Sequence, residues 1–100
     1  MEIENHTLID NREGRRYEFE IGAHRPRIEY IRAADRIYLT HTEVPPELAG
    51  KGIGSALIAA ALKAIEQEGL TLVPLCPFVA LYLQRNPEWK KLVMKGINIA

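Results

Sequence analysis

Three side chains of this sequence have the chemistry that a group-transfer reaction needs. Cys76 is the single cysteine, and its thiol becomes a nucleophile when a neighbouring group lowers its pKa. His41 has an intrinsic pKa suited to a general base, and Glu43 follows two residues later on the same face, where it could act as the base or orient the histidine. Each also has a structural interpretation: Cys76 as a small buried hydrophobe, His41 as a packed strand residue and Glu43 as a solvated one.

A glycine-rich stretch is the second feature with a possible chemical role. It reads Gly50-Lys51-Gly52-Ile53-Gly54 and is followed by Ser55. The first amides of a helix have no partner within the helix, and the helix dipole favours negative charge there. The stretch therefore predicts an anion site to which Lys51 adds a cation, or else a tight turn that only starts a helix. Its spacing matches neither the Walker A loop nor the dinucleotide fingerprint.

The first half of the chain must form the strands that position these residues. Tyr17, Phe19 and Ile21 alternate with charged residues, the pattern of a strand with one solvated face. Similar reasoning predicts strands over 7–9, 27–32 and 36–44, joined by short turns. Together they predict an antiparallel meander, which Pro45-Pro46 ends because proline cannot donate to a β-ladder.

The second half changes to helical periodicity. One apolar stripe runs from Ile53 to Ile65, and Gly69 is a suitable C-terminal stop. The short apolar run over 70–75 predicts a buried strand, which completes a right-handed parallel βαβ unit. Pro74 lies within this strand and predicts that pairing fails there, either at a sheet edge or where two strands separate.

The remaining segment is expected to be helical. A helix is predicted over 78–85, and Asn86 followed by Pro87 has the composition of a helix start, with Asn86 as the N-cap. The last short helix would then continue through Trp89.

Composition bounds the class of protein. The chain has 100 residues, 47% of them hydrophobic, with 13 basic and 13 acidic side chains, which predicts one domain over residues 1–100 and argues against disorder. Zero formal net charge gives no general attraction to nucleic acid or to an anionic membrane. No apolar run is long enough to span a bilayer and the N-terminus is polar, so we expect a cytoplasmic protein. The single cysteine and scattered histidines predict neither a disulfide framework nor a metal site.

The segment around the glycines resembles a known motif. Residues 42–57, TEVPPELAGKGIGSAL, are similar to motif A of the GNAT superfamily of acetyltransferases, and HTEVP, VPLCP and RNPE at 41–45, 73–77 and 85–88 resemble its small single-domain branch. The likeness covers roughly 36–93, and the N-terminal meander is compatible with it. It implies an α+β fold: a mixed, mostly antiparallel sheet with a central splayed parallel pair, one long helix and one or two short C-terminal helices.

The resemblance implies acetyl-coenzyme A as co-substrate, bound where the parallel strands separate. The backbone of Val44 would hold the pantetheine arm and the acetyl group, and Arg85 and Asn86 would lie towards the nucleotide end. Ala49 stands where the superfamily usually has Gln or Arg, which removes one side-chain contact. The amides that would hold the pyrophosphate are those of Gly50, Lys51, Gly52, Ile53, Gly54 and Ser55.

The resemblance also implies an activity, the transfer of an acetyl group to a primary amine on a small molecule or a protein lysine. His41 and Glu43 are then the candidate bases, and Cys76 would form an acyl-enzyme unless transfer is direct. Tyr82 matches a tyrosine that protonates the departing thiolate, or it belongs to the core. The short turn after residue 8 leaves no room for the two helices that form the acceptor site in larger members. A coenzyme A-binding or partner-binding module without turnover is therefore the second hypothesis, and a plain interaction domain is the third.

Overall fold

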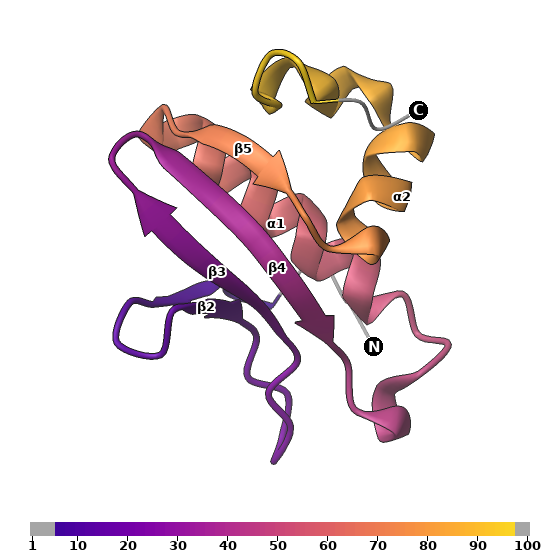
Figure 1. Ribbon diagram of the computed structural model, residues 1–100. Coiled ribbons are helices and arrows are strands. Elements are labelled where there is room, and N and C mark those ends of the chain that lie inside the picture. Colours follow the sequence, from indigo (N-terminus) through magenta and orange to yellow (C-terminus); the bar gives the residue numbers. More distant parts are fainter. Residues whose placement is uncertain (1–5, 98–100) are drawn as a thin grey trace.

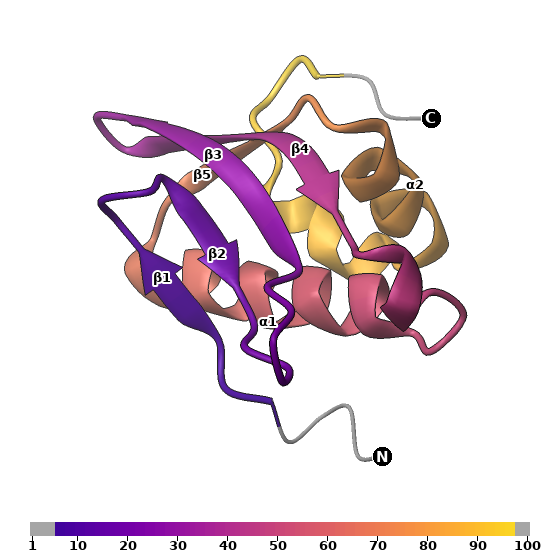
Figure 2. The ribbon, with the colours of Figure 1, turned by 90° about the horizontal axis from the view of Figure 1, so that it is seen from below.

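The computed structural model describes residues 6–97, whose strands form one five-stranded sheet in the order β1-β2-β3-β4-β5 (Figures 1 and 2). Neighbours in the sheet pair antiparallel except for β4 and β5, which are parallel. The predicted α+β class and meander are confirmed. The strands are β1 (Ile9–Asn11), β2 (Arg16–Glu18), β3 (Arg27–Ala33), β4 (Arg36–Glu43) and β5 (Thr71–Pro74).

The strand predicted to reach Ile21 is shorter in the structure. Regular pairing in β2 stops at Glu18, and beyond it the Phe19 amide donates to the Pro26 carbonyl and Ile21 forms an isolated bridge with His24. Pro26 has no N–H to return the bond, so the ladder cannot continue through it.

One long helix covers one face of the sheet. Helix α1 (Ile53–Glu68) runs beneath the strands and ends at Gly69, whose φ of 71° is the left-handed conformation expected at a helix stop (Figure 2). A short 3-10 helix, η2 (Pro46–Leu48), joins β4 to the glycine-rich stretch. The chain continues after β5 into α2 (Pro77–Arg85), which lies beyond the end of β4, and then into the 3-10 helix η3 (Pro87–Leu92).

Asn86 is the N-cap residue of η3, as predicted. Its side chain makes no capping hydrogen bond at the start of η3. Instead its Nδ2 donates to the carbonyl oxygen of Tyr82 at 3.0 Å. The same carbonyl oxygen accepts the backbone N–H of Asn86 at 2.9 Å, so the residue is bonded twice to the last turn of α2. Asn86 therefore closes α2.

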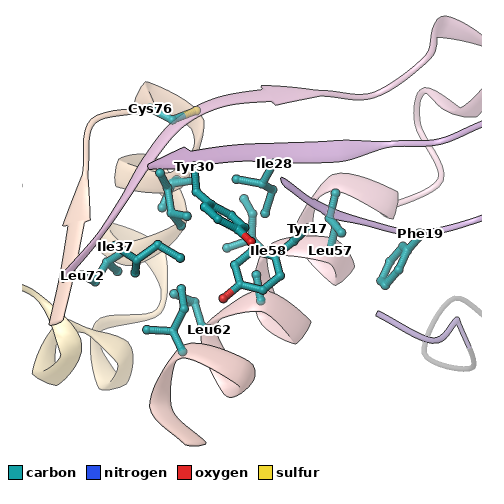
Figure 3. Close-up of a cluster of buried hydrophobic side chains, with 14 of the residues drawn as sticks. Tyr17, Phe19, Ile28, Tyr30, Ile37, Leu57, Ile58, Leu62, Leu72 and Cys76 are labelled. Atoms are coloured by element: carbon teal, nitrogen blue, oxygen red, sulfur yellow. The ribbon is translucent and has the colours of Figure 1, made fainter. Parts of the chain in front are cut away.

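The core fills the layer between the sheet and α1. The inward side chains of the strands meet one apolar stripe of the helix (Figure 3), as its period predicted. These side chains are fully buried: Tyr17, Ile28, Ile37 and Leu39 from the sheet, and Leu57, Ile58 and Leu62 from α1.

The parallel pair lies at the edge of the sheet, whereas we expected it at the centre. Beyond β5 the described residues provide only an isolated bridge between Leu72 and Val93, because the chain after α2 forms η3 and no further strand. Regular pairing of β4 with β5 ends at Leu39 and Pro74. Pro74 thus lies both on an edge strand and at the point where two strands separate.

An ion-pair network ties the start of the sheet to the far end of α1. Arg12 and Arg32 each contact the carboxylates of Asp10 and Glu68, at 2.7 to 3.1 Å. The hydroxyl of Tyr30 also donates to Asp10. The network joins β1, β3 and the last turn of α1 at the end of the helix opposite the glycine-rich stretch.

Candidate functional site

A cavity of about 370 Å³ opens where β4 and β5 separate. The amides of Leu75 and Cys76 both donate to the carbonyl oxygen of Leu39, at 3.0 and 2.9 Å, and regular pairing ends there. The described residues of the cavity wall carry no charged side chain. The polar groups that the wall offers to a ligand are therefore backbone groups and the hydroxyls of Thr42 and Ser55. The wall residues are Thr42, Val44, Leu48, Ala49, Gly50, Gly52, Ile53, Gly54, Ser55 and Phe78.

The N-terminus of α1 faces this cavity without a side-chain cap. Gly52 is the N-cap residue, and both it and Gly50 have positive φ, at 73° and 78°, a conformation that costs glycine nothing. The first turn of the helix holds no acidic residue. The first amides of a 16-residue helix and its dipole thus remain free to bind an anion. Lys51 is exposed and is not part of the wall.

A β-bulge at Thr40 decides which side chains of β4 reach the cavity. Tyr30 pairs with Leu39 and Glu29 with His41, so Thr40 is an extra residue without an opposite partner. Thr42 lies opposite the fully buried Ile28 and therefore points to the face that α1 covers. The bulge shifts the inward positions of the strand, which places Thr42 and Val44 on the cavity wall.

The same bulge turns His41 and Glu43 to the other face of the sheet. Nε2 of His41 and Oε1 of Glu43 are 2.8 Å apart, and the two side chains are 53% and 49% exposed. The expectation that the two residues share one face of the strand is confirmed. They do not line the cavity, so β4 separates them from it.

Cys76 lies next to the cavity wall rather than on it. It is 4% exposed and immediately precedes α2, and its Sγ is 3.3 Å from Oγ1 of Thr42. Thr42 therefore connects the thiol to the cavity. Thr42 could not be selected from the sequence, because its position at the cavity depends on the bulge.

The other residues expected at the site lie further along α2. Tyr82 is half-buried against the core, and burial, together with the nearby carboxylate of Glu88, raises the pKa of its hydroxyl. Arg85 is seven residues beyond Phe78, about 10 Å along the helix axis. Neither Arg85 nor Asn86 is part of the wall.

Phe78 is a wall residue that the sequence interpretation missed. Its ring lies against Gly54 in the first turn of α1, so close that a Cβ atom added to Gly54 would be 2.6 Å from the ring. The helix was predicted over 78–85, but the sequence pattern did not show which of its faces would meet the cavity.

Two negative findings apply to the described part of the chain. Residues 6–97 contain no group of three or more His, Cys, Asp or Glu side chains that could hold a metal ion. Over the same residues, no helix is both long and apolar enough to cross a membrane.

The fold and the cavity define the class: a small α+β domain whose parallel strands diverge beside an uncapped helix N-terminus. The sequence model of the GCN5-related N-acetyl-transferases matches residues 16–92, and the chain belongs to that family. The match extends from β2 to η3 and so includes strands that the motifs alone did not cover. A search of the curated proteins found no match.

Proposed function

We propose that the protein binds acetyl-coenzyme A in this cavity and transfers the acetyl group to a primary amine. The observation that carries the proposal is that the uncapped N-terminus of α1 lies at the cavity where the parallel strands β4 and β5 separate. Membership of the acetyltransferase family supports acetyl as the group that is transferred.

In the proposed complex the pyrophosphate binds the amides from Gly52 to Ser55, where the helix dipole favours negative charge. Lys51 is exposed beside these amides and adds a positive charge from solvent. The pantetheine arm follows β4 along Val44, where β5 has already separated. The acetyl group then lies at the Thr42 end of the wall. Arg85 lies about 10 Å beyond Phe78 along the axis of α2, and Asn86 follows it. We propose these two residues only as contacts for the nucleotide end of the coenzyme.

The transfer step needs a neutral amine. An alkylamine has a pKa near 10.4 and is almost fully protonated at neutral pH, so a base must first take a proton. In the direct route the amine nitrogen attacks the thioester carbonyl, the C–S bond breaks, and the thiolate of coenzyme A receives a proton. We propose the His41–Glu43 pair, on the other face of β4, as the final acceptor of the amine proton, reached through water rather than by direct contact, and Tyr82 as the donor to the thiolate. The hydroxyl of Tyr82 is protonated at neutral pH, as that of any tyrosine with a pKa near 10 is, and burial and the carboxylate of Glu88 raise its pKa further.

A binding module without turnover is the second candidate, and one observation favours it. The described residues of the wall include no titratable side chain, and His41 and Glu43 lie on the opposite face of β4. Binding needs only the amides and the apolar wall, whereas turnover also needs a proton acceptor on the amine side.

The coenzyme site is tested with Ser55→Glu. Ser55 is exposed in the first turn of α1, where a carboxylate interacts favourably with the helix dipole. The substitution should therefore leave the free energy of unfolding unchanged or raise it. The same charge would repel the pyrophosphate, and we expect the Kd for acetyl-coenzyme A to rise about tenfold in titration calorimetry.

The matched control is Gln67→Glu, which adds the same charge at an exposed position near the other end of α1. Its Kd should equal that of the wild type. Equal weakening by both variants would contradict the helix N-terminus as the anion site. No heat of binding from the wild type at high micromolar ligand would rule out the coenzyme site itself.

Turnover is tested by an acceptor screen. Polyamines, free amino acids and lysine peptides should be incubated with acetyl-coenzyme A, and release of the free thiol of coenzyme A measured. Acetylation of any one class supports the transferase. Tight binding of acetyl-coenzyme A without thiol release above the hydrolysis background would favour the binding module.

A further inference from the structure

We propose that a second cavity, at the end of the sheet near the last turn of α1, binds a small oxyanion such as a phosphate or a carboxylate. The inference goes beyond the proposed function and does not depend on it. The cavity has a volume of about 340 Å³ and lies where the turn between β1 and β2 passes beside β3 (Figure 2). Its wall consists of Arg12, Arg15, Tyr30, Ile31 and Arg32.

The cavity exists because β2 pairs with only the first part of β3. That pairing reaches Arg16 opposite Glu29, and beyond it the amide of Tyr30 donates to the carbonyl oxygen of Arg15 at 2.9 Å. Backbone groups of successive residues in a strand point alternately to its two neighbours, so those of Arg32 point to the same side as those of Tyr30. No strand of the described residues pairs with β3 on that side beyond this point. The main chain of Arg32 is therefore available to a ligand.

Three guanidinium groups line the cavity, and that of Arg15 has no acidic partner among residues 6–97. The carboxylates that pair with Arg12 and Arg32 lie outside the wall. Glu13, in the same turn as Arg15, is exposed and is also not a wall residue. A guanidinium presents several N–H donors in a planar fork that matches two oxygens of a carboxylate or a phosphate. The wall thus offers one unpaired fork and the remaining donors of two others.

The backbone of Arg15 adopts a conformation that a residue with a side chain disfavours. Its φ is 56°, in the left-handed region where glycine is preferred. Gly14, immediately before it, does not have a positive φ. The turn therefore has arginine at the position that a glycine would fit better. Strain of this kind is retained where the side chain has a function, and oxyanion binding in the cavity supplies one.

The test is a titration of the full-length, 15N-labelled chain with citrate and with inorganic phosphate, followed by NMR at constant ionic strength. We expect the amide signals of residues 12–15 and of Arg32 to shift with a Kd of about 1 mM. The signals of residues 52–55, at the proposed pyrophosphate site, should follow a separate binding curve. The anion that binds more tightly tells whether the cavity takes carboxylates or phosphates.

Arg15→Gly distinguishes a ligand-binding role from a structural one. Glycine suits the left-handed φ and removes the guanidinium, so the variant should unfold at the same urea concentration as the wild type or at a higher one. Its Kd for the anion should nevertheless rise at least about tenfold. A lower stability combined with an unchanged Kd would show that the side chain serves the fold, and would overturn the proposal.

Arg15→Gln and Arg36→Gln form a matched pair, because each removes one positive charge from an exposed arginine. Arg36 lies at the start of β4 and does not line the cavity. Only Arg15→Gln should raise the Kd, whereas equal weakening by both variants would reveal a general charge effect and contradict the site. Wild-type signals that do not move up to about 10 mM of either anion would also contradict it. Shifts confined to residues 52–55 would overturn this proposal and leave the proposed coenzyme site standing.

Discussion

At the scale of single residues, the burial of Cys76 bears on the route of acetyl transfer. The thiol is 4% exposed and contacts Thr42, and it does not line the cavity. An acyl-enzyme would need the thioester to pass the Thr42 side chain. The position therefore favours direct transfer from acetyl-coenzyme A to the amine.

Cys76→Ala tests this route. We expect the variant to bind acetyl-coenzyme A with the wild-type Kd and to keep its rate of acetyl transfer, because the thiol is not on the wall. Intact-mass spectrometry of the wild type after incubation with acetyl-coenzyme A should show no adduct of one acetyl group. Loss of transfer in the variant, or an adduct mapped to residue 76, would instead establish the covalent route.

Tyr17 offers a test of a buried polar atom. The side chain is fully buried, and its hydroxyl oxygen has no hydrogen-bond partner among the described residues. Burial raises the pKa of the hydroxyl and keeps it protonated. A buried hydroxyl without a partner costs free energy, so Tyr17→Phe should raise the free energy of unfolding by about 1 kcal/mol in urea titration. A decrease would show that the hydroxyl has a partner, such as a bound water.

At the scale of elements, the bulge in β4 shows where sequence patterns stop being informative. The segment Thr40-His41-Thr42-Glu43 alternates regularly, and nothing in it marks an extra residue. Simple alternation from Leu39 would place His41 and Glu43 inside. The pairing with β3 inserts Thr40 and reverses this, so Thr42 faces the cavity. The glycine-rich loop could be predicted because positive φ and an open helix start require particular residue types, whereas a bulge of this kind does not.

The network between β1, β3 and α1 makes a prediction about pH. Burial alone would raise the pKa of Asp10, but hydrogen bonds from Tyr30 and Arg12 and the charges of Arg12 and Arg32 lower it overall. Because the pKa is lower in the folded state, the carboxylate stabilises the fold above its ordinary pKa of about 4, and this contribution is lost as the pH falls through the folded value. Asp10→Asn should cost about 1.5 kcal/mol at pH 7.

Urea titrations at pH 7 and near pH 2.5 check this prediction. The difference between the wild type and Asp10→Asn should shrink at the lower pH, because protonation of the wild-type carboxyl group progressively removes the charge that the network stabilises. Glu20→Gln is the control, since Glu20 is 58% exposed and its ion pair with Arg25 lies at the surface, where such pairs contribute little. A cost for Asp10→Asn that is the same at both pH values would contradict an electrostatic origin.

At the scale of the whole molecule, the period of the apolar residues predicted the meander and the parallel βαβ unit, whereas the resemblance to the acetyltransferase motif implied the α+β class. Local patterning carries this information because each strand or helix buries one face. The place of the parallel pair in the sheet was not predictable in the same way. It depends on whether residues after α2 add another strand, and the described residues form η3 and a single bridge there.

The strand order has a consequence for how the chain is made. Every strand of the sheet lies beside the one that precedes it in sequence, so most pairing is local, and local pairing favours rapid folding. As the chain leaves the ribosome, each new strand can add to a sheet edge that already exists, and no strand has to wait for a distant partner. The cavity is different, because its wall is complete only when Phe78 has emerged. A nascent chain that ends before α2 would contain all five strands but would lack one side of the proposed coenzyme site.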